Sequence, residues 1–397
     1  MALESTVQQP TARVAFYNDP KIRSILYQAA LAALILLLLY GAVHNAIVNL
    51  QRAHIASGFG FWNNTAGFDI SQTLIQFSSS TSTYGRAFWV GLLNTLLVAG
   101  LGIVLATILG FTVGICRLSS NWLLSRVATG YVELIRNVPL LLQLLFWYNA
   151  VLKALPDLRD SIQFWGGSFL NNRGLFLPQP IARPGFGAVE IALLIGIVGA
   201  IAYRTWARRR QMATGQQAPV LWVALALVIG LPLVVYAISG FPLEFAYPEK
   251  GRFNIRGGVE IVPEFAALLV GLVIYTAAFI AEVVRAGIRS VSHGQTEAAY
   301  SLGLRPGPTL RLIVVPQAMR VIIPPLTSQY LNLTKNSSLA VFIGYPDLVQ
   351  VFTGTVLNQT GQAVEVVLIT MAVYLAISLT TSIGMNIYNA RIALVER

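Results

Sequence analysis

The polar residues that could do chemistry in this 397-residue chain stand within or beside long apolar runs. Lys335, Asn336 and Ser337 interrupt one such run. A charge in the middle of a membrane span costs about 2.5–3.5 kcal/mol to insert, so these side chains are expected to face protein or a water-filled path. Asn94 and Gln143 lie inside other apolar runs, where they suit hydrogen bonds between helices as well as contacts with a transported solute.

Two Glu-Arg pairs have a spacing of three residues, which brings both charges to one side of a helix. Glu133 and Arg136 lie at the start of one apolar run, and Glu282 and Arg285 lie near the end of another. A local ion pair that permits a polar helix end is the favoured interpretation of both pairs. A place for Arg136 on a translocation path is the alternative.

Several kinds of site are excluded by the residues that the chain lacks. It has no Gly-x-x-x-x-Gly-Lys-Ser/Thr phosphate loop, so we expect no ATP binding or hydrolysis by the chain itself. Its three histidines do not have metal-ligand spacing, and no nucleophile triad occurs. We therefore predict no catalytic residues, no metal and no cofactor. The net charge of +11 is spread between apolar runs rather than gathered in one basic patch, which argues against nucleic acid as a partner.

Membrane spans are the elements that must position these polar residues. Hydrophobic residues make up 55% of the chain and charged residues 11%, whereas a soluble domain carries about 25% charged residues. Several runs are long enough to cross about 30 Å of hydrocarbon. The sequence predicts an all-α integral membrane protein of about eight transmembrane helices, at residues 25–48, 87–113, 132–152, 187–203, 218–239, 262–284, 321–344 and 365–389.

The distribution of Lys and Arg predicts the orientation of these spans. One set of alternate loops, with both termini, holds 16 Lys and Arg in 98 residues, and the other set holds nine in 112 residues. The first set is therefore expected in the cytoplasm, and both termini with it. The first apolar run is too long for the core of a signal peptide, so we expect it to be retained as a span.

A short helix with small side chains is predicted in the cytoplasmic loop before the seventh span. Ser292 and Gln295 fit a capping box at its start, and Gly303 suits the left-handed residue that ends it. Ala298 and Ala299 give it a small face. The helix is too short to be stable alone in water, so another element must pack against it.

A second helix is predicted after the turn, beginning at Pro308. Pro316, and then Pro324 and Pro325, are expected to interrupt it and redirect the chain into the seventh span. Its expected apolar face consists of Leu310, Ile313, Val314 and Ala318. From the residues alone, an amphipathic connector resting on lipid headgroups and a docking site for a cytoplasmic partner are equally good interpretations of the loop.

The spacing of this loop resembles the EAA loop of ABC-importer permeases. The matching positions are Glu297, Ala298, Ala299, Gly303, Ile313, Val315 and Pro316, and Val315 stands where the family usually has Leu. The resemblance implies that these positions, with Leu302, couple the chain to a separate ATPase subunit. The short helix would then lie in a cleft of the ATPase and transmit its closure.

About half of the chain, residues 87–152 and 262–390, resembles polar amino-acid permeases of this family. The carrying segments are LLNTLLVAGLGIVLATILGFTVGICRLS, YVELIRNVPLLLQLLFWY, YTAAFIAEVVRAGIRSVSHGQTEAA and YLNLTKNSSLAVFIGYPDL. The enlarged layout looks like the permease subunit of general L-amino-acid ABC transporters. It implies a type I permease core with extra spans, divided into an N-terminal part (1–86), a first core part (87–152), an insertion with two spans (153–258) and a second core part (259–397).

The resemblance implies a bacterial inner-membrane permease that takes up L-amino acids of broad or polar specificity. Its implied partners are an ABC ATPase, a second permease forming a heterodimer, a periplasmic amino-acid-binding protein and membrane lipid. Asn94, Arg136, Gln143, Lys335, Asn336 and Ser337 are the candidate path residues. A self-contained secondary transporter or channel is the alternative; it predicts coupling carboxylates near mid-membrane, whereas the acidic residues here are expected at span ends.

Overall fold

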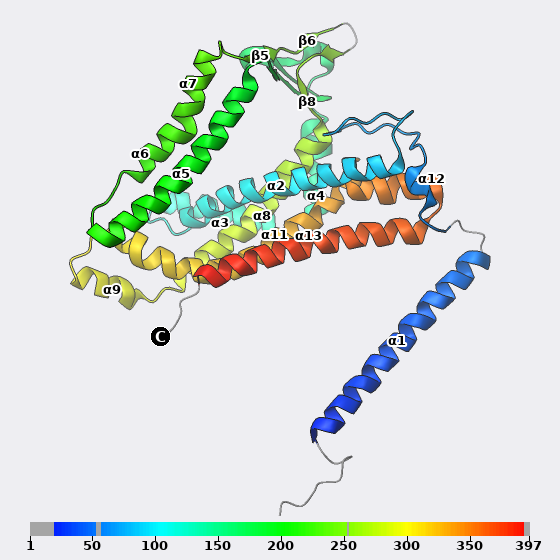
Figure 1. Cartoon of the computed structure of the whole chain (residues 1–397), viewed down its shortest axis with the longest axis horizontal. Coiled ribbons are helices and arrows are strands. Elements are labelled where there is room, and N and C mark those ends of the chain that lie inside the picture. The colour runs from blue at the N-terminus through cyan, green and yellow to red at the C-terminus, as the bar shows by residue number, and fades with distance from the viewer. Residues whose placement is uncertain (1–19, 53–56, 252–253, 393–397) are drawn as a thin grey trace, which may run out of the picture.

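The computed structural model describes residues 20–52, 57–251 and 254–392 (Figure 1). Its α-helices are α1 (Pro20–Arg52), α2 (Tyr84–Cys116), α3 (Trp122–Asn137), α4 (Leu140–Leu145), α5 (Phe186–Thr214), α6 (Val220–Leu225), α7 (Leu231–Ile238), α8 (Pro263–Arg289), α9 (His293–Ser301), α10 (Pro306–Thr309), α11 (Val315–Asn336), α12 (Leu357–Thr360) and α13 (Ala363–Ile392). The all-α membrane fold is confirmed, because seven helices in the described residues are long and apolar enough to cross a membrane.

The third predicted span, 132–152, is two helices rather than one. α3 ends at Asn137, and a shorter apolar helix runs over Leu140–Leu152. Val138 between them is extended, as expected for the residue before a proline, here Pro139. The third span therefore has a break at about its first quarter.

The seventh predicted span is longer than expected, because the prolines do not break it. A continuous helical path runs from Pro306 through α11 to Phe342 and contains Pro324 and Pro325. A π-helical turn over Leu310–Val314 directly precedes Pro316 and widens the backbone there. The expected redirection of the chain at these prolines is wrong.

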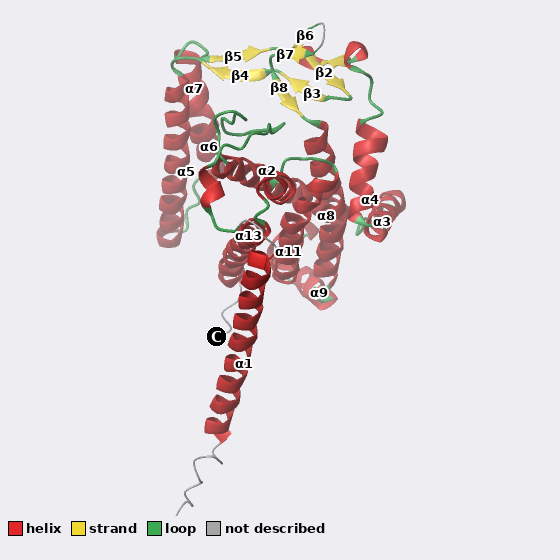
Figure 2. Cartoon of the chain, turned by 90° about the vertical axis from the view of Figure 1, so that its right-hand side faces the viewer, coloured by secondary structure: helices red, strands yellow, loops and turns green. Residues whose placement is uncertain are grey.

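The described residues form eight short strands that the sequence did not predict, seven in the insertion at 153–258 and the eighth directly after it. They are β1 (Ile162–Phe164), β2 (Ser168–Asn171), β3 (Gly174–Leu177), β4 (Gln179–Ala182), β5 (Leu243–Ala246), β6 (Glu249–Lys250), β7 (Ile255–Arg256) and β8 (Val259–Ile261). They pair antiparallel in the order β1-β2-β3-β8, with two further pairs, β4-β5 and β6-β7. Apart from α1, which extends away from the other helices, the strands lie at one end of the helices and α9 at the opposite end (Figures 1 and 2).

The core is built where α2, α8 and α11 pack closely. Gly110 and Gly114 of α2 lie directly against Ile280 and Val284 of α8. Because glycine has no side chain, the two helix backbones can approach each other closely, as in small-residue helix pairs of membrane proteins. Two buried alanines of α2, Ala99 and Ala106, share this cluster with side chains of α8 and α11.

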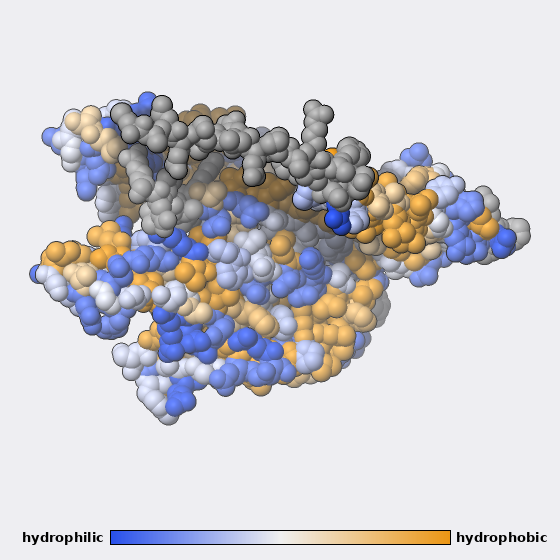
Figure 3. All heavy atoms as spheres, turned by 90° about the horizontal axis from the view of Figure 1, so that it is seen from below, coloured by the Kyte–Doolittle hydropathy of each residue, from blue (hydrophilic) through white to orange (hydrophobic). Residues whose placement is uncertain are grey.

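The two extra spans of the insertion form a separate pair. The first span is α5, and the second is the helical segment Val220–Ile238, which includes α6 and α7. α5 packs against this segment, with Gly196 against the carbonyl of Leu227. The two spans stand beside the core in Figures 1 and 2. Large apolar side chains of these helices are exposed, and broad apolar areas also cover the face seen in Figure 3. Such exposure suits helices that face lipid.

Candidate functional site

Helix α9 begins where the sequence predicted, but without the capping box. Ser292 occupies the cap position and makes no side-chain hydrogen bond there. The side chain of Gln295 instead accepts a hydrogen bond from Gln317 Nε2 of α11 at 3.3 Å. This contact links α9, the candidate coupling helix, to α11. The Gln295 side chain therefore does not bond to the start of α9 as the capping box predicted.

The end of α9 is a Schellman turn centred on Gly303. Gly303 has a φ of 78°, the left-handed conformation that glycine adopts without strain. The Gly303 N–H donates to the Tyr300 carbonyl at 2.9 Å, and the Leu304 N–H donates to the Ala299 carbonyl at 3.1 Å. The predicted role of Gly303 in ending the helix is confirmed.

One face of α9 is exposed and carries mostly small side chains, apart from Leu302 and from Glu297, which contacts His293 of the same helix. Ala299 points inward and is 1% exposed, whereas the outward face follows a helical repeat of three and four residues. That exposed face, called the α9 free face below, consists of Gly294, Glu297, Ala298, Ser301 and Leu302. Leu302 is 81% exposed, a large apolar side chain left for another molecule to cover.

The helix after the turn differs from the expectation in its start and in one residue of its apolar face, whereas Ile313 and Val314 are half-buried and Ala318 is buried, as expected. It begins at Pro306, with Arg305 as its cap, and not at Pro308. Thr309 is buried, but Leu310, expected on the apolar face, is exposed. The π-helical turn that starts at Leu310 changes the side-chain register, which the ordinary helical repeat does not anticipate.

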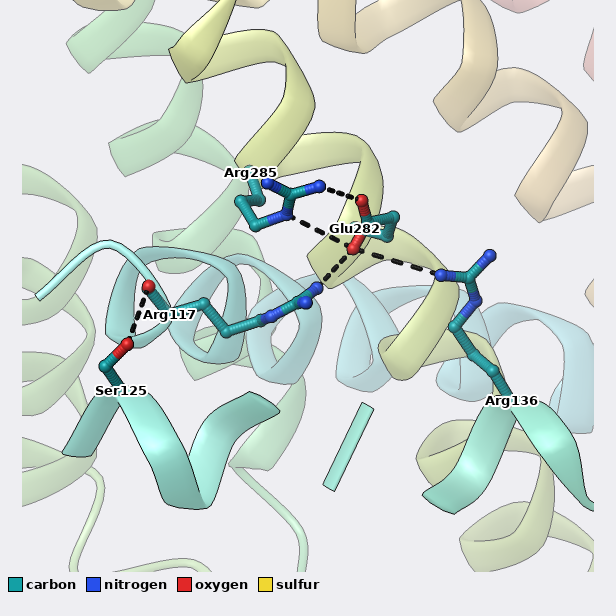
Figure 4. A network of polar contacts seen from close by, with 5 residues as sticks. All are labelled: Arg117, Ser125, Arg136, Glu282 and Arg285. Carbon is teal, nitrogen blue, oxygen red and sulfur yellow. Dashed lines mark hydrogen bonds and ion pairs between the residues drawn. The ribbon is translucent and has the colours of Figure 1, made fainter. Parts of the chain in front are cut away.

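A cluster of four charges joins three helices near α9 (Figure 4). It consists of Arg117 after α2, Arg136 in α3, and Glu282 and Arg285 in α8, and is called the Glu282 cluster below. The Glu282 carboxylate is in ion pairs with Arg117 and Arg285, and Arg136 Nη1 lies 3.9 Å from Glu282 Oε2. The predicted Glu282–Arg285 pair is confirmed. Arg136 pairs with Glu282 rather than with the expected Glu133.

Two further contacts connect the helices around the Glu282 cluster. The Ser125 hydroxyl of α3 donates to the Arg117 carbonyl at 3.0 Å, which ties the start of α3 to the end of α2 (Figure 4). The Arg136 guanidinium lies 5.1 Å from the centre of the Phe279 ring in α8. Glu282 therefore sits at the meeting point of α2, α3 and α8.

Asn94 and Gln143 are buried, and their amide groups bond to backbone. Asn94 Nδ2 donates to the carbonyls of Gln72 and Pro346, at 2.9 and 2.8 Å. Gln143 Nε2 donates to the carbonyls of Ile135 and Val138, which lie at the break between α3 and α4. Both contacts favour the structural alternative that the sequence left open.

Lys335, Ser337 and Asn336 lie where α11 changes from an α-helix to a tighter 3₁₀ turn at Ser337–Phe342. Ser337 is buried, Asn336 is half-buried and Lys335 is exposed. Lys335 lines an open hollow of about 430 Å³ between α11 and α13, together with Ser338, Val349, Thr370, Met371, Tyr374, Leu375 and Ser378. The hollow combines one cation, several hydroxyls and an apolar wall.

Two polar residues beside these sites, Asp347 and Arg117, were not among the residues predicted from the sequence. Asp347 is fully buried, and its carboxylate accepts hydrogen bonds from the Tyr374 hydroxyl of α13 and the Gln350 N–H. Asp347 lies five residues after the end of the span helix at Phe342, and its partner Tyr374 is near the middle of α13. Arg117 was missed too, although it is the first charge after a long uncharged run.

Comparison with known proteins identifies relatives over nearly the whole chain. Residues 192–394 match the family described as binding-protein-dependent transport system inner membrane component. The general L-amino acid transport system permease protein AapQ of Rhizobium johnstonii is 56% identical over 385 residues, which cover 97% of this chain and 96% of that protein.

Two further relatives align equally completely. The putative amino-acid ABC transporter permease protein YhdX of Escherichia coli is 50% identical over 381 residues, 96% of this chain and 97% of that protein. The glutamate/glutamine/aspartate/asparagine transport system permease protein BztB of Rhodobacter capsulatus is 42% identical over 431 residues and covers 100% of both chains.

Proposed function

This chain belongs to the binding-protein-dependent transport system inner membrane components, and on that basis we propose that it is the permease subunit of an ATP-driven importer of L-amino acids. It is thus a multi-pass component of the inner membrane. The names of the three relatives support amino acids of broad or polar character as the cargo. ATP hydrolysis would take place on a separate subunit, because this sequence has no phosphate loop.

The observation that carries the proposal is the α9 free face. Its small side chains allow close approach of another protein, and exposed Leu302 offers an apolar contact at its end. The Schellman turn fixes the end of the helix, and the Gln295–Gln317 hydrogen bond links the helix to α11. A short helix that has a defined end, is bonded to α11 and is exposed on one face suits contact with a partner protein, here an ABC ATPase.

A polar stripe on α11 supports a path shared with a second permease. Ser328, Asn332 and Lys335 are all exposed and follow a helical repeat inside an apolar span. Such groups do not face lipid without large cost. We expect a second permease subunit, in a heterodimer, to cover this stripe and to enclose a water-filled path along it.

The hollow beside Lys335 has the chemistry to hold an amino acid on this path. An ammonium group pairs well with an α-carboxylate, the hydroxyls of Thr370 and Ser378 can bond to polar groups, and Met371 offers an apolar contact. Arg136 and Asn336 remain candidates at the edges of the path. Asn94 and Gln143 are better explained as groups that fix the frame around it.

The strands of the insertion lie opposite α9, which suits contact with a periplasmic binding protein on the outer side. This orientation, with both termini in the cytoplasm, rests on the excess of Lys and Arg on the α9 side of the spans. The division into core parts at 87–152 and 259–397 and an insertion at 153–258 is part of the same proposal.

The docking claim is tested by co-purification of the ATPase with this chain from its native membrane. Replacing Ala298 by Trp puts a large side chain on the α9 free face, so we expect the ATPase to be lost while the chain accumulates normally. Ala213→Trp is the matched control, since Ala213 is also an exposed helical alanine on the predicted cytoplasmic side. An ATPase that stays bound to the Ala298→Trp variant would contradict docking at this face.

A further inference from the structure

The Glu282 cluster lies at one end of a tightly packed helix pair. A side chain at Gly110 would come within 2.6 Å of Ile280, and one at Gly114 within 2.8 Å of Val284. Arg117 lies seven residues after Gly110 and three residues after Gly114, so it continues the same face of α2 toward α8. The ion pair between Arg117 and Glu282 thus closes the contact between α2 and α8 at its last turn.

The same end of α8 leads directly into the coupling helix candidate. Only Ser290, Val291 and Ser292 separate α8 from α9. Gly287, between Glu282 and that junction, packs so closely on α11 that an added side chain would lie 2.3 Å from Ile322. The last two turns of α8 therefore contact α2 and α3 at Glu282 and α11 at Gly287.

The contacts of Glu282 differ in strength. The Arg117 side chain is 9% exposed, so its ion pair is shielded from water, whereas the Arg136 side chain is 40% exposed and its nitrogen lies 3.9 Å away. Charges interact more strongly where water is excluded. Arg285 belongs to the same helix as Glu282 and cannot join helices by this contact. Arg117 is thus the main partner between helices.

We propose that Glu282 is a positioning residue that makes α2, α8 and α9 move as one body when the ATPase closes on α9. The inference rests on the proposed function, since it assigns a transmission step to that importer. When α9 moves, α8 would move with it, and the Arg117–Glu282 pair would move α2 together with α8. Without this pair, α8 would slide against α2. The longer contact of Arg136 with Glu282 would couple α3 to this movement more weakly.

The test measures amino acid taken up per ATP hydrolysed by the complete transporter in liposomes, with a mixture of radiolabelled L-amino acids as the probe. Glu282→Gln keeps the shape of the side chain and removes its charge. Typical couplings between sites correspond to factors of about 5 to 150, so we expect uptake per ATP to fall about fivefold or more. Arg117→Gln should lower it more than Arg136→Gln.

Two further variants separate transmission from simple folding. Glu133→Gln removes an exposed carboxylate of α3 that forms no ion pair with any described residue, and should leave uptake per ATP unchanged. The double variant Arg117→Gln, Glu282→Gln removes both charges of the main pair and leaves no buried charge without a partner, so it should accumulate normally and still show a lowered uptake per ATP. If the double variant had the uptake per ATP of the unmodified chain, the proposal would be overturned. Glu282 would then only neutralise the buried charge of Arg117.

The outcome also separates this inference from the proposed function. If no ATPase binds the unmodified chain, the importer proposal fails. If the ATPase binds and hydrolyses ATP but the Glu282→Gln variant keeps its uptake per ATP, only the positioning role of Glu282 is wrong.

Discussion

At the scale of single residues, the polar groups of this membrane protein fall into two kinds. Asn94 and Gln143 are buried, and their side-chain amide N–H groups donate hydrogen bonds to backbone carbonyls. Their side-chain oxygens, Asn94 Oδ1 and Gln143 Oε1, are buried without a hydrogen-bond partner among the described residues. Lys335 is exposed and faces an open hollow lined by hydroxyl groups. The exposed ammonium group of Lys335 is accessible to a solute.

Replacing Lys335 by Met is expected to reduce uptake while leaving ATPase binding intact. A hydrogen bond to a charged group contributes about 1.5–3 kcal/mol, which corresponds to a loss of about tenfold or more in uptake at low substrate concentration. The measurement is the concentration dependence of uptake in liposomes. Lys335→Arg keeps the charge and should retain most of the activity. Equal uptake by Lys335→Met and the unmodified chain would remove Lys335 from the path.

Residue spacing predicts local pairs and misses distant ones. The Glu282–Arg285 pair was predicted because three residues separate its members, and Gly303 was predicted because a left-handed helix end favours glycine. The partnership of Glu282 with Arg117, 165 positions away in sequence, has no local signal. Arg136 was for the same reason assigned to Glu133, its neighbour in sequence.

At the scale of elements, close packing of α2 on α8 depends on glycine. The structure places Gly110 against Ile280 and the carbonyl of Ala277, with no room for a side chain. Gly100 of the same helix has open space around its Cα and faces outward. The two positions therefore separate the effect of helix packing from the effect of changing a glycine in a helix.

Gly110→Leu is expected to destabilise the protein, and Gly100→Leu to leave its stability nearly unchanged. Overpacking of a well-packed core costs typically about 1–3 kcal/mol. The thermal unfolding temperature of the purified chain in detergent measures the difference. Equal unfolding temperatures for the two variants would show that α2 and α8 are not in the close contact described above.

Apolar runs predicted the membrane helices well, because length and hydropathy alone decide whether a helix can span a bilayer. The short strands were missed, since segments of two to four residues are too short to show an alternating pattern. Pro316, Pro324 and Pro325 predicted helix breaks that do not occur. A π-helical turn precedes Pro316, and the helix of the seventh span continues through Pro324 and Pro325.

At the scale of the whole molecule, the two ends have different structures. Antiparallel strands from the insertion lie at one end and lead through β8 directly into α8. At its other end α8 meets the Glu282 cluster and then α9 (Figures 1 and 4). A single helix thus joins the proposed outer side of the permease to its proposed ATPase contact.

The central claim is that α9 couples this permease to an ATPase, and one substitution tests it most directly. Gly303→Asp forces a side chain into the left-handed conformation, at a cost of about 1–2 kcal/mol, without a clash, because no atom lies within 4 Å of the position of its Cβ. Gly215→Asp is the matched control, since Gly215 ends α5 with a φ of 73° and equally open surroundings.

The measurement is amino-acid uptake together with ATP hydrolysis by both variants of the complete transporter in liposomes. We predict that Gly303→Asp accumulates normally but loses uptake driven by ATP, and that Gly215→Asp transports like the unmodified chain. Full uptake by the Gly303→Asp variant at normal abundance would contradict the coupling role of α9.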